Sequence, residues 1–156
     1  MTTREHLGSC HCGAVRFACA IDWSRGTSRC NCSVCTKSRF WKAVIPSAQF
    51  RLLSGEDDLS QYRFGREQIV HHFCRHCGVK TFGTGAHPAL GGPFHGVNIE
   101  CLDDLTPEDL AALPVKYEDG RHDRWEVAPE VTRYLRRPAN QRRARSLSRS
   151  GSECSG

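Results

Sequence analysis

Ten of the 156 residues are cysteines, and their spacing is the clearest chemical signal in the chain. Seven of them form three short clusters: Cys10 and Cys12; Cys30, Cys32 and Cys35; Cys74 and Cys77. Spacings this short place several sulfurs around one ion. The N-terminus has no apolar stretch of the signal-peptide type, and in a reducing compartment such clusters are more often metal sites than disulfides.

The first and third clusters have the features of a closed zinc site. Structural zinc prefers four thiolates in a tetrahedron, and a cysteine pair on a tight turn supplies two adjacent corners. A glycine, Gly13 or Gly78, follows each pair and lets the backbone bend around the ion. Both pairs border strand-like segments, so two turns from distant parts of the chain can meet. The expected ligands are Cys10, Cys12, Cys74 and Cys77.

The middle cluster has three cysteines within six residues and no evident fourth protein ligand. Three protein ligands with one exchangeable position are typical of catalytic zinc. Metal coordination lowers a thiol pKa far below its usual value, so such a site could hold a substrate thiol as its thiolate. We therefore expect Cys30, Cys32 and Cys35 to form a second, catalytic zinc site. Nearby polar candidates for orienting a substrate are Ser33, Lys37 and Ser38.

Other interpretations of the cysteines remain open. All seven could bind one structural site, the middle three could be metal-free or redox-active, or the cysteines could be unrelated core residues. Of the remaining three, Cys19 and Cys101 are expected in the core and Cys154 is expected to be inert. The histidines near the clusters and in the following loop are expected at the surface.

The intervening segments predict a mainly β fold. Residues 13–21 alternate, with Val15, Phe17, Cys19 and Ile21 on one side, as in a half-buried strand. Turn-forming residues separate the further strand-like segments, which are 40–45, 50–53, 59–64, 69–73, 79–82, 96–102 and 115–118. Short strands at this spacing favour antiparallel sheets in a sandwich or barrel-like fold.

One short helix is expected after Thr106, because this residue is an N-cap type and Pro107 follows at the first helical position. Pro114 ends the apolar run that follows. Residues 136–156 are basic and rich in Ser and Arg, with almost no apolar content, and are expected to be a disordered tail. The predicted organisation is a domain over residues 1–135 followed by this tail.

The net charge of +5 comes from the tail, where six arginines face one acid. The remainder is neutral, so a nucleic-acid role is not indicated except through the tail. No apolar run approaches the roughly 20 residues that a membrane helix needs. We expect a cytoplasmic protein without a membrane contact.

Six segments resemble the glutathione-dependent formaldehyde-activating enzyme family, which includes the centromere protein V type. Their cysteine motifs are CHCG, CNCSVC and CRHCG, and the segments, in order, are 8–17, 30–38, 50–55, 62–65, 73–78 and 97–103. The resemblance implies a β-tent zinc fold, shared with methionine sulfoxide reductase B. It implies the two zinc sites described above, and a carbon–sulfur lyase that forms or breaks S-(hydroxymethyl)glutathione from glutathione and formaldehyde.

The function expected from the sequence is therefore a zinc-dependent lyase acting on an adduct of an aldehyde with glutathione or a similar thiol. The stretch after the third cluster, residues 82–94, departs from the family pattern, in which an arginine and further polar groups often follow. The alternative is a non-enzymatic zinc module that binds a protein or RNA. A redox switch through the middle cysteines is a third hypothesis.

Overall fold

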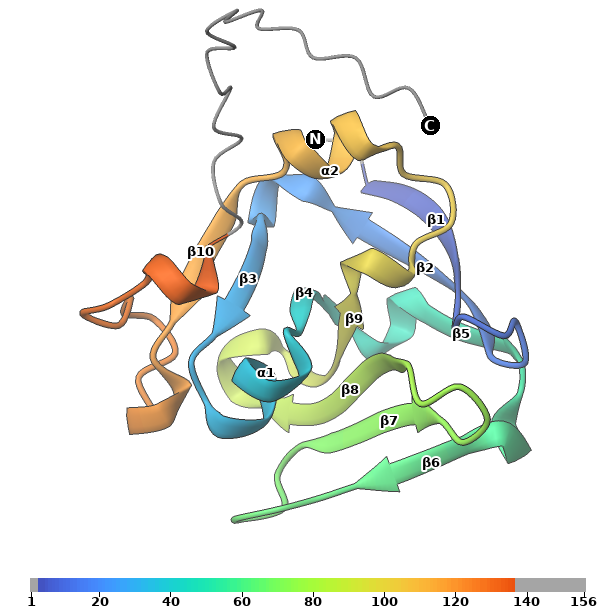
Figure 1. Ribbon diagram of the computed structural model, residues 1–156, viewed down its shortest axis with the longest axis horizontal. Coiled ribbons are helices and arrows are strands. Elements are labelled where there is room, and N and C mark those ends of the chain that lie inside the picture. The colour runs from blue at the N-terminus through green and yellow to red at the C-terminus, as the bar shows by residue number, and fades with distance from the viewer. Residues whose placement is uncertain (1–2, 137–156) are drawn as a thin grey trace, which may run out of the picture.

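The computed structural model describes residues 3–136, which form two β-sheets and two short α-helices (Figure 1). The smaller sheet is antiparallel and has the order β1 (Thr3–Ser9), β2 (Arg16–Asp22), β5 (Phe50–Ser54). The larger sheet has seven strands, in the order β10 (Val115–Glu118), β3 (Thr27–Cys30), β4 (Trp41–Pro46), β9 (Gly92–Asn98), β8 (Lys80–His87), β7 (Val70–Cys74), β6 (Leu59–Tyr62). The helices are α1 (Ser33–Ser38) and α2 (Pro107–Ala112). The predicted mainly β fold is confirmed.

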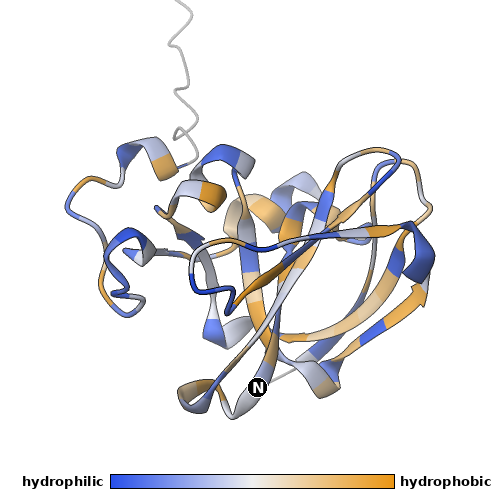
Figure 2. Cartoon of the chain, turned by 90° about the horizontal axis from the view of Figure 1, so that it is seen from below, coloured by the Kyte–Doolittle hydropathy of each residue, from blue (hydrophilic) through white to orange (hydrophobic). Residues whose placement is uncertain are grey.

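The predicted alternation around β2 is also confirmed. Val15, Phe17, Cys19 and Ile21 are all buried. Their neighbours Arg16 and Ala20 are more accessible, although Ala18 is buried as well. Figure 2 shows hydrophobic residues interspersed with hydrophilic ones along the strands. One face of β2 therefore packs into the core.

The main core lies where the smaller sheet meets the larger one. Phe17, Cys19 and Ile21 of β2 form one cluster with buried side chains from β4, β9 and the 3-10 turn after β9. The members from these elements are Trp41, Ala43, Ile45, Val97, Ile99, Cys101 and Leu102. Cys19 and Cys101 are thus core residues, as expected, and burial raises the pKa of each thiol to about 12. Both are neutral packing groups at physiological pH.

Three elements differ from the sequence-based expectation. β1, β3 and the helix α1 were not predicted. The pairing of β10 with β3 is parallel, whereas every other strand pair within residues 3–136 is antiparallel. β3 is short and buried along its whole length, so it has no alternating pattern to detect. The chain between β3 and β10 is long and contains the other strands of the larger sheet. Parallel pairing of two strands requires a long connection of this kind.

The helix expected after Thr106 is present as α2. The Thr106 hydroxyl accepts a hydrogen bond from the Asp109 backbone N–H, and the Asp109 carboxylate accepts one from the Thr106 N–H, which completes a capping box. The predicted tail lies outside the described residues, except for Arg136, which is exposed. Within residues 3–136, no helix has the length and apolar character needed to cross a membrane.

Truncating the core at β2 should destabilise the fold. Phe17→Ala removes a fully buried ring that stacks on Phe50, with ring centroids 5.3 Å apart, and is expected to lower the free energy of unfolding by about 3–5 kcal/mol. Leu53→Ala on β5 is the control, because that side chain is largely exposed and its loss should cost less than about 1 kcal/mol. Urea unfolding of the metal-loaded proteins measures both. Equal losses for the two variants would contradict this assignment of the core.

Candidate metal centres

The first and third cysteine clusters come together in the structure. The sulfurs of Cys10, Cys12, Cys74 and Cys77 all lie within 4.8 Å of one another. The distances from Cys12 Sγ to Cys10 Sγ and to Cys74 Sγ are both 3.6 Å. Four thiolates at about 2.3 Å from a central zinc would lie about 3.8 Å apart along each edge of the tetrahedron. The four sulfurs therefore have the arrangement of a closed tetrahedral metal cage.

Two similar turns build this cage. The Cys10 N–H donates to the Val15 carbonyl and the Cys74 N–H donates to the Val79 carbonyl, each at 3.0 Å. The glycine in each turn, Gly13 or Gly78, donates its N–H back to the carbonyl of the first cysteine. Both glycines have positive φ angles, 79° and 73°, which a residue with a Cβ rarely adopts. The predicted role of glycine at these turns is therefore confirmed.

The four-cysteine cluster connects the two sheets. Cys10 and Cys12 lie in the turn from β1 to β2, in the smaller sheet, whereas Cys74 ends β7 of the larger sheet and Cys77 follows it. Cys10 and Cys74 are buried together with Val15 in a small core of their own. A metal ion in this cluster would hold the sheets together at the edge remote from α2.

The middle cluster forms a second, separate group. The sulfurs of Cys30, Cys32 and Cys35 lie within 4.8 Å of one another. Cys30 ends β3, Cys32 is the N-cap residue of α1, and Cys35 lies in that helix, so a single strand-to-helix turn supplies all three. The Cys32 N–H donates to Cys30 Sγ at 3.3 Å. Among the described residues, no fourth Cys, His, Asp or Glu joins this group.

The three thiols differ in burial and in charge. Cys30 and Cys35 are buried, whereas Cys32 is partly exposed. Hydrogen bonds from Cys30 and Cys35 hold the pKa of Cys32 well below its usual range, while the contact with Cys32 raises the pKa of Cys30. The pKa of Cys35 is raised as well, so the negative charge of the group lies on Cys32, which is the sulfur nearest to solvent.

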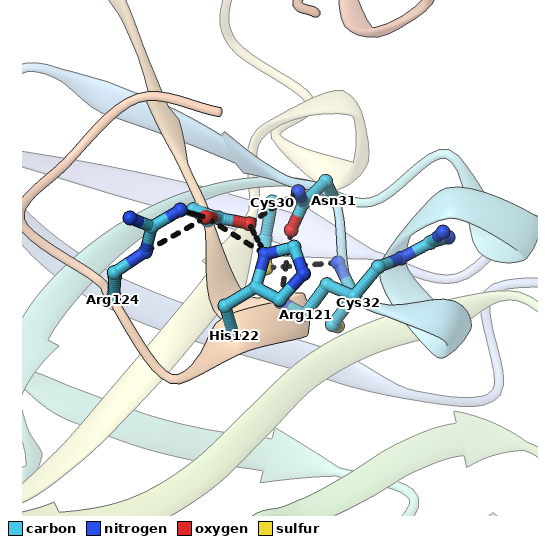
Figure 3. Close-up of polar contacts among 7 residues, drawn as sticks. Cys30, Asn31, Cys32, Arg121, His122 and Arg124 are labelled. Carbon is cyan, nitrogen blue, oxygen red and sulfur yellow. Dashed lines mark hydrogen bonds and ion pairs between the residues drawn. The ribbon is translucent and has the colours of Figure 1, made fainter. Parts of the chain in front are cut away.

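A hydrogen-bonded segment lies against this cluster (Figure 3). Asn31, between the first two cysteines, donates through Nδ2 to Asp119 Oδ1 at 2.6 Å and accepts from the Arg121 N–H at 2.9 Å. The buried Asp119 carboxylate also receives bonds from His122 and Arg124. The bond from Asn31, together with those from Arg124 and His122, lowers the Asp119 pKa to about 2. The carboxylate is therefore ionised and fixes the segment beside the cysteines.

Gly120 of this segment lies directly against the cluster. A Cβ built on Gly120 would lie 2.5 Å from Cys30 Sγ and 2.6 Å from Trp125 Cζ3, which leaves no room for a side chain. The Cys30 sulfur and the indole of Trp125 thus both pack against Gly120 where a side chain would otherwise lie. This contact could not be predicted from the sequence, because Asp119 and Gly120 have the composition of an ordinary turn.

Two lysines also lie near the cluster. Burial disfavours the charge of Lys42, but its 2.6 Å ion pair with Glu118 raises its pKa above the usual value. Lys80 Nζ lies 3.6 Å from the centre of the Phe40 ring, and Phe40 packs with Cys30 and Cys35. Burial lowers the Lys80 pKa to about 8, against the opposing effect of the Cys35 and Cys32 charges. Lys80 was not identified from the sequence.

The other polar candidates from the sequence lie on the outside of α1. Ser33, Lys37 and Ser38 are exposed, and the Ser38 hydroxyl donates to the Val34 carbonyl of its own helix. Their proposed orienting role stays a prediction.

The surface placement expected for the histidines is confirmed for His11, His76 and His87, but it is wrong for His71. That ring is buried because β7 places it between Lys80 and the aromatic rings of Phe64 and Tyr62.

A sequence model of the glutathione-dependent formaldehyde-activating enzyme family matches residues 5–117, which is most of the chain. The chain belongs to this family. A crystal structure of a Rhodobacter sphaeroides protein is similar, with a TM-score of 0.60 and 31% sequence identity, covering 70% of this chain and 99% of that chain. The formaldehyde-activating family match ends before Asp119, so the segment that lies against the three-cysteine cluster follows the matched region.

Both cysteine clusters could hold a metal ion, and we expect them to respond differently to mutation. Cys32→Ser should lower the metal content by one ion per chain and leave the fold intact, because its cluster lies within one turn of one sheet. Cys12→Ser should instead destabilise the protein markedly, because binding free energy at a structural site is folding free energy. Elemental analysis and thermal unfolding of both variants test this. An unchanged metal content in Cys32→Ser would show that Cys32 is not a required ligand.

Gly120→Ala tests the approach of the 119–124 segment to the cluster. The added methyl group would overlap Cys30 Sγ, so the sulfur or the segment must move. We expect metal affinity at the three-cysteine cluster to fall by about 10–100-fold, as is usual when groups supporting a ligand are disturbed. Competition with a chromophoric chelator measures this, and the four-cysteine cluster serves as an internal control. Identical affinities in the variant and the wild type would contradict the tight contact.

Proposed function

We propose that the protein is a zinc-dependent carbon–sulfur lyase acting on the adduct of glutathione, or a similar small thiol, with formaldehyde or a related aldehyde. The observation that carries the proposal is a group of three converging sulfurs, with no fourth side-chain ligand among the described residues. Family membership supports glutathione and formaldehyde as the reactants.

Zinc fits both donor sets. The four-cysteine cluster has the sulfur–sulfur distances of a tetrahedral thiolate site, and the ligands of the second cluster would be Cys30, Cys32 and Cys35. When bound there, zinc would supply a Lewis acid that stabilises a thiolate at neutral pH. Soft sulfur ligands also favour zinc over magnesium or calcium. We infer one structural and one catalytic ion per chain.

The chemistry is the addition of a thiol to a carbonyl, or its reversal. In the forward direction the sulfur donates its electron pair to the carbonyl carbon, a C–S bond forms, and the carbonyl oxygen accepts the proton that the thiol has lost. In the reverse direction the hydroxyl loses its proton as the C–S bond breaks. No redox step is needed, so the thiols of the cluster are consistent with a role as ligands throughout.

Access to the cluster favours the Cys32 side. On the side of Cys30 and Cys35, the adjoining cavity of about 10 Å³ is lined by residues including Phe40 and Leu135 and is far too small for a thiol. Cys32 is the cysteine of the group that is partly exposed. A substrate thiol would therefore approach beside Cys32.

The sequence motifs and this chemistry suit a reducing, glutathione-containing compartment, and we propose the cytoplasm.

Adduct formation tests the function directly. Zinc-loaded protein mixed with glutathione and formaldehyde should form S-(hydroxymethyl)glutathione faster than the spontaneous reaction, as measured by exchange NMR. Cys32→Ser should reduce the rate constant by at least about a hundredfold, because it removes a ligand of the reacting site. Wild-type protein that holds both zinc ions and gives no acceleration would exclude this substrate pair.

A truncation separates this proposal from a binding module that uses the basic tail. Deleting residues 136–156 should leave the lyase rate within about twofold, because the three-cysteine cluster is built from residues 30–35 and neighbours that precede the deletion. A protein whose measurable activity is RNA or protein binding through the tail would lose it on truncation. The same deletion therefore gives opposite results for the two functions.

A further inference from the structure

A pair of basic residues, the half-buried Lys80 and the buried His71, borders the three-cysteine cluster and has no role in the metal sites. Lys80 begins β8 and His71 belongs to the neighbouring strand β7. Lys80 Nζ donates to His71 Nδ1 at 2.8 Å. Neither residue is among the cysteine ligands, and no carboxylate ion pair with Lys80 is recorded among the described residues.

The hydrogen bond defines the protonation of the imidazole. An ammonium group has only donors, so His71 Nδ1 must be the acceptor and the ring proton must lie on Nε2. That nitrogen is buried and has no hydrogen-bond partner within the described part of the chain. The His71 side chain itself is 6% exposed. A buried donor without an acceptor is uncommon in a native protein, and it indicates that a ligand or water supplies the acceptor.

The pair is close to the reacting cluster. Lys80 Nζ lies over the Phe40 ring, whose other contacts include the buried Cys30 and Cys35. The charges of Cys35 and Cys32 act on Lys80, and the charge of Cys32 also acts on His71. The second nearby lysine, Lys42, is already neutralised by Glu118. Lys80 therefore brings to the cluster a positive charge that no carboxylate ion pair among the described residues neutralises.

We propose that Lys80 binds the aldehyde oxygen during the reaction and that His71 is the residue that positions it. This inference rests on the lyase function proposed above. As the C–S bond forms, the electron pair of the carbonyl π bond moves onto the oxygen, and the ammonium group of Lys80 donates a hydrogen bond to the resulting alkoxide. A water molecule then protonates the alkoxide, and the proton that the thiol released neutralises the hydroxide that is left. In the reverse direction the same contact stabilises the alkoxide before the C–S bond breaks.

The position of the bulge in β7 explains how one strand serves two sites. The register between β7 and β8 shifts between His72 and Phe73. Before the shift, His71 bonds to Lys80 beside the three-cysteine cluster, while His72 bonds to Thr84. After the shift, Cys74 enters the four-cysteine cage. Bulges of this kind re-aim side chains next to functional sites.

Lys80→Met removes the charge and keeps most of the side-chain length. We expect kcat to fall by about 10²–10³-fold, as for loss of one donor to a developing oxyanion. The dissociation constant for glutathione alone, measured by calorimetry, should change by less than about threefold, because the sulfur is bound elsewhere. The zinc content should stay at the wild-type value. Lys116→Met, an exposed lysine on β10, is the matched control and should behave as wild type.

His71→Phe tests the positioning role with a ring of similar size. If His71 acts through Lys80, the double variant should be no slower than Lys80→Met, within about twofold, whereas independent effects would multiply. A double variant that is much slower than Lys80→Met would overturn the positioning role.

The failure of this inference differs from failure of the lyase proposal. If wild-type protein accelerates the reaction and Lys80→Met keeps kcat within about threefold, Lys80 does not bind the oxygen. If Lys80→Met loses a zinc ion together with activity, Lys80 supports the metal and the assignment is also wrong. If zinc-loaded wild type gives no acceleration, the lyase proposal fails first and the role of Lys80 fails with it.

Discussion

The structure depends on the convergence of four sulfurs from two sheets onto one point. β1 and β2 deliver Cys10 and Cys12, and the β7–β8 turn delivers Cys74 and Cys77, with sulfurs as close as 3.6 Å. Four thiolates at that separation repel one another unless a cation lies between them, so this arrangement requires a metal or protons to be stable. A cation there would fix the angle between the sheets, and the core of Phe17, Trp41 and Val97 fills the space between them.

The three-cysteine cluster is built on a different principle. Its ligands come from one turn between β3 and α1, so it does not hold distant parts of the fold together. Its surroundings, in contrast, come from far along the chain and include Asp119, Gly120, Lys80 and His71. Because its ligands come from one turn and only the surrounding residues come from distant parts of the chain, this site can lose or exchange a ligand without unfolding the protein. Catalytic turnover requires such exchange. The closed cage cannot exchange a ligand in this way.

The sequence predicted the cysteine chemistry better than it predicted the surroundings. Cysteine spacing and the following glycines are local features, and the two groups appeared as expected because a turn dictates where its own sulfurs lie. β3 and α1 were missed because four buried residues and a six-residue helix carry no clear period. Lys80, His71 and Asp119 were missed because their importance arises only from the pairing of strands far apart in sequence. The proposed division at residue 135 remains untested, and residues 137–156 lie outside the described part.

The charges around the two clusters follow their proposed roles. Four thiolates and one divalent ion leave two negative charges in the closed cage, and backbone N–H groups such as that of Val15, at 3.3 Å from Cys10 Sγ, lie close enough to offset part of this charge. Three thiolates and one divalent ion leave a single negative charge, and Lys80 is a nearby cation for which the described residues provide no carboxylate ion pair. The resting site is then close to neutral. An incoming thiolate would add one negative charge, and that charge is lost to the aldehyde oxygen when the C–S bond forms. Lys80, which offsets the negative charge of the resting cluster, is therefore well placed to stabilise the negative charge when it moves from the thiolate sulfur to the aldehyde oxygen.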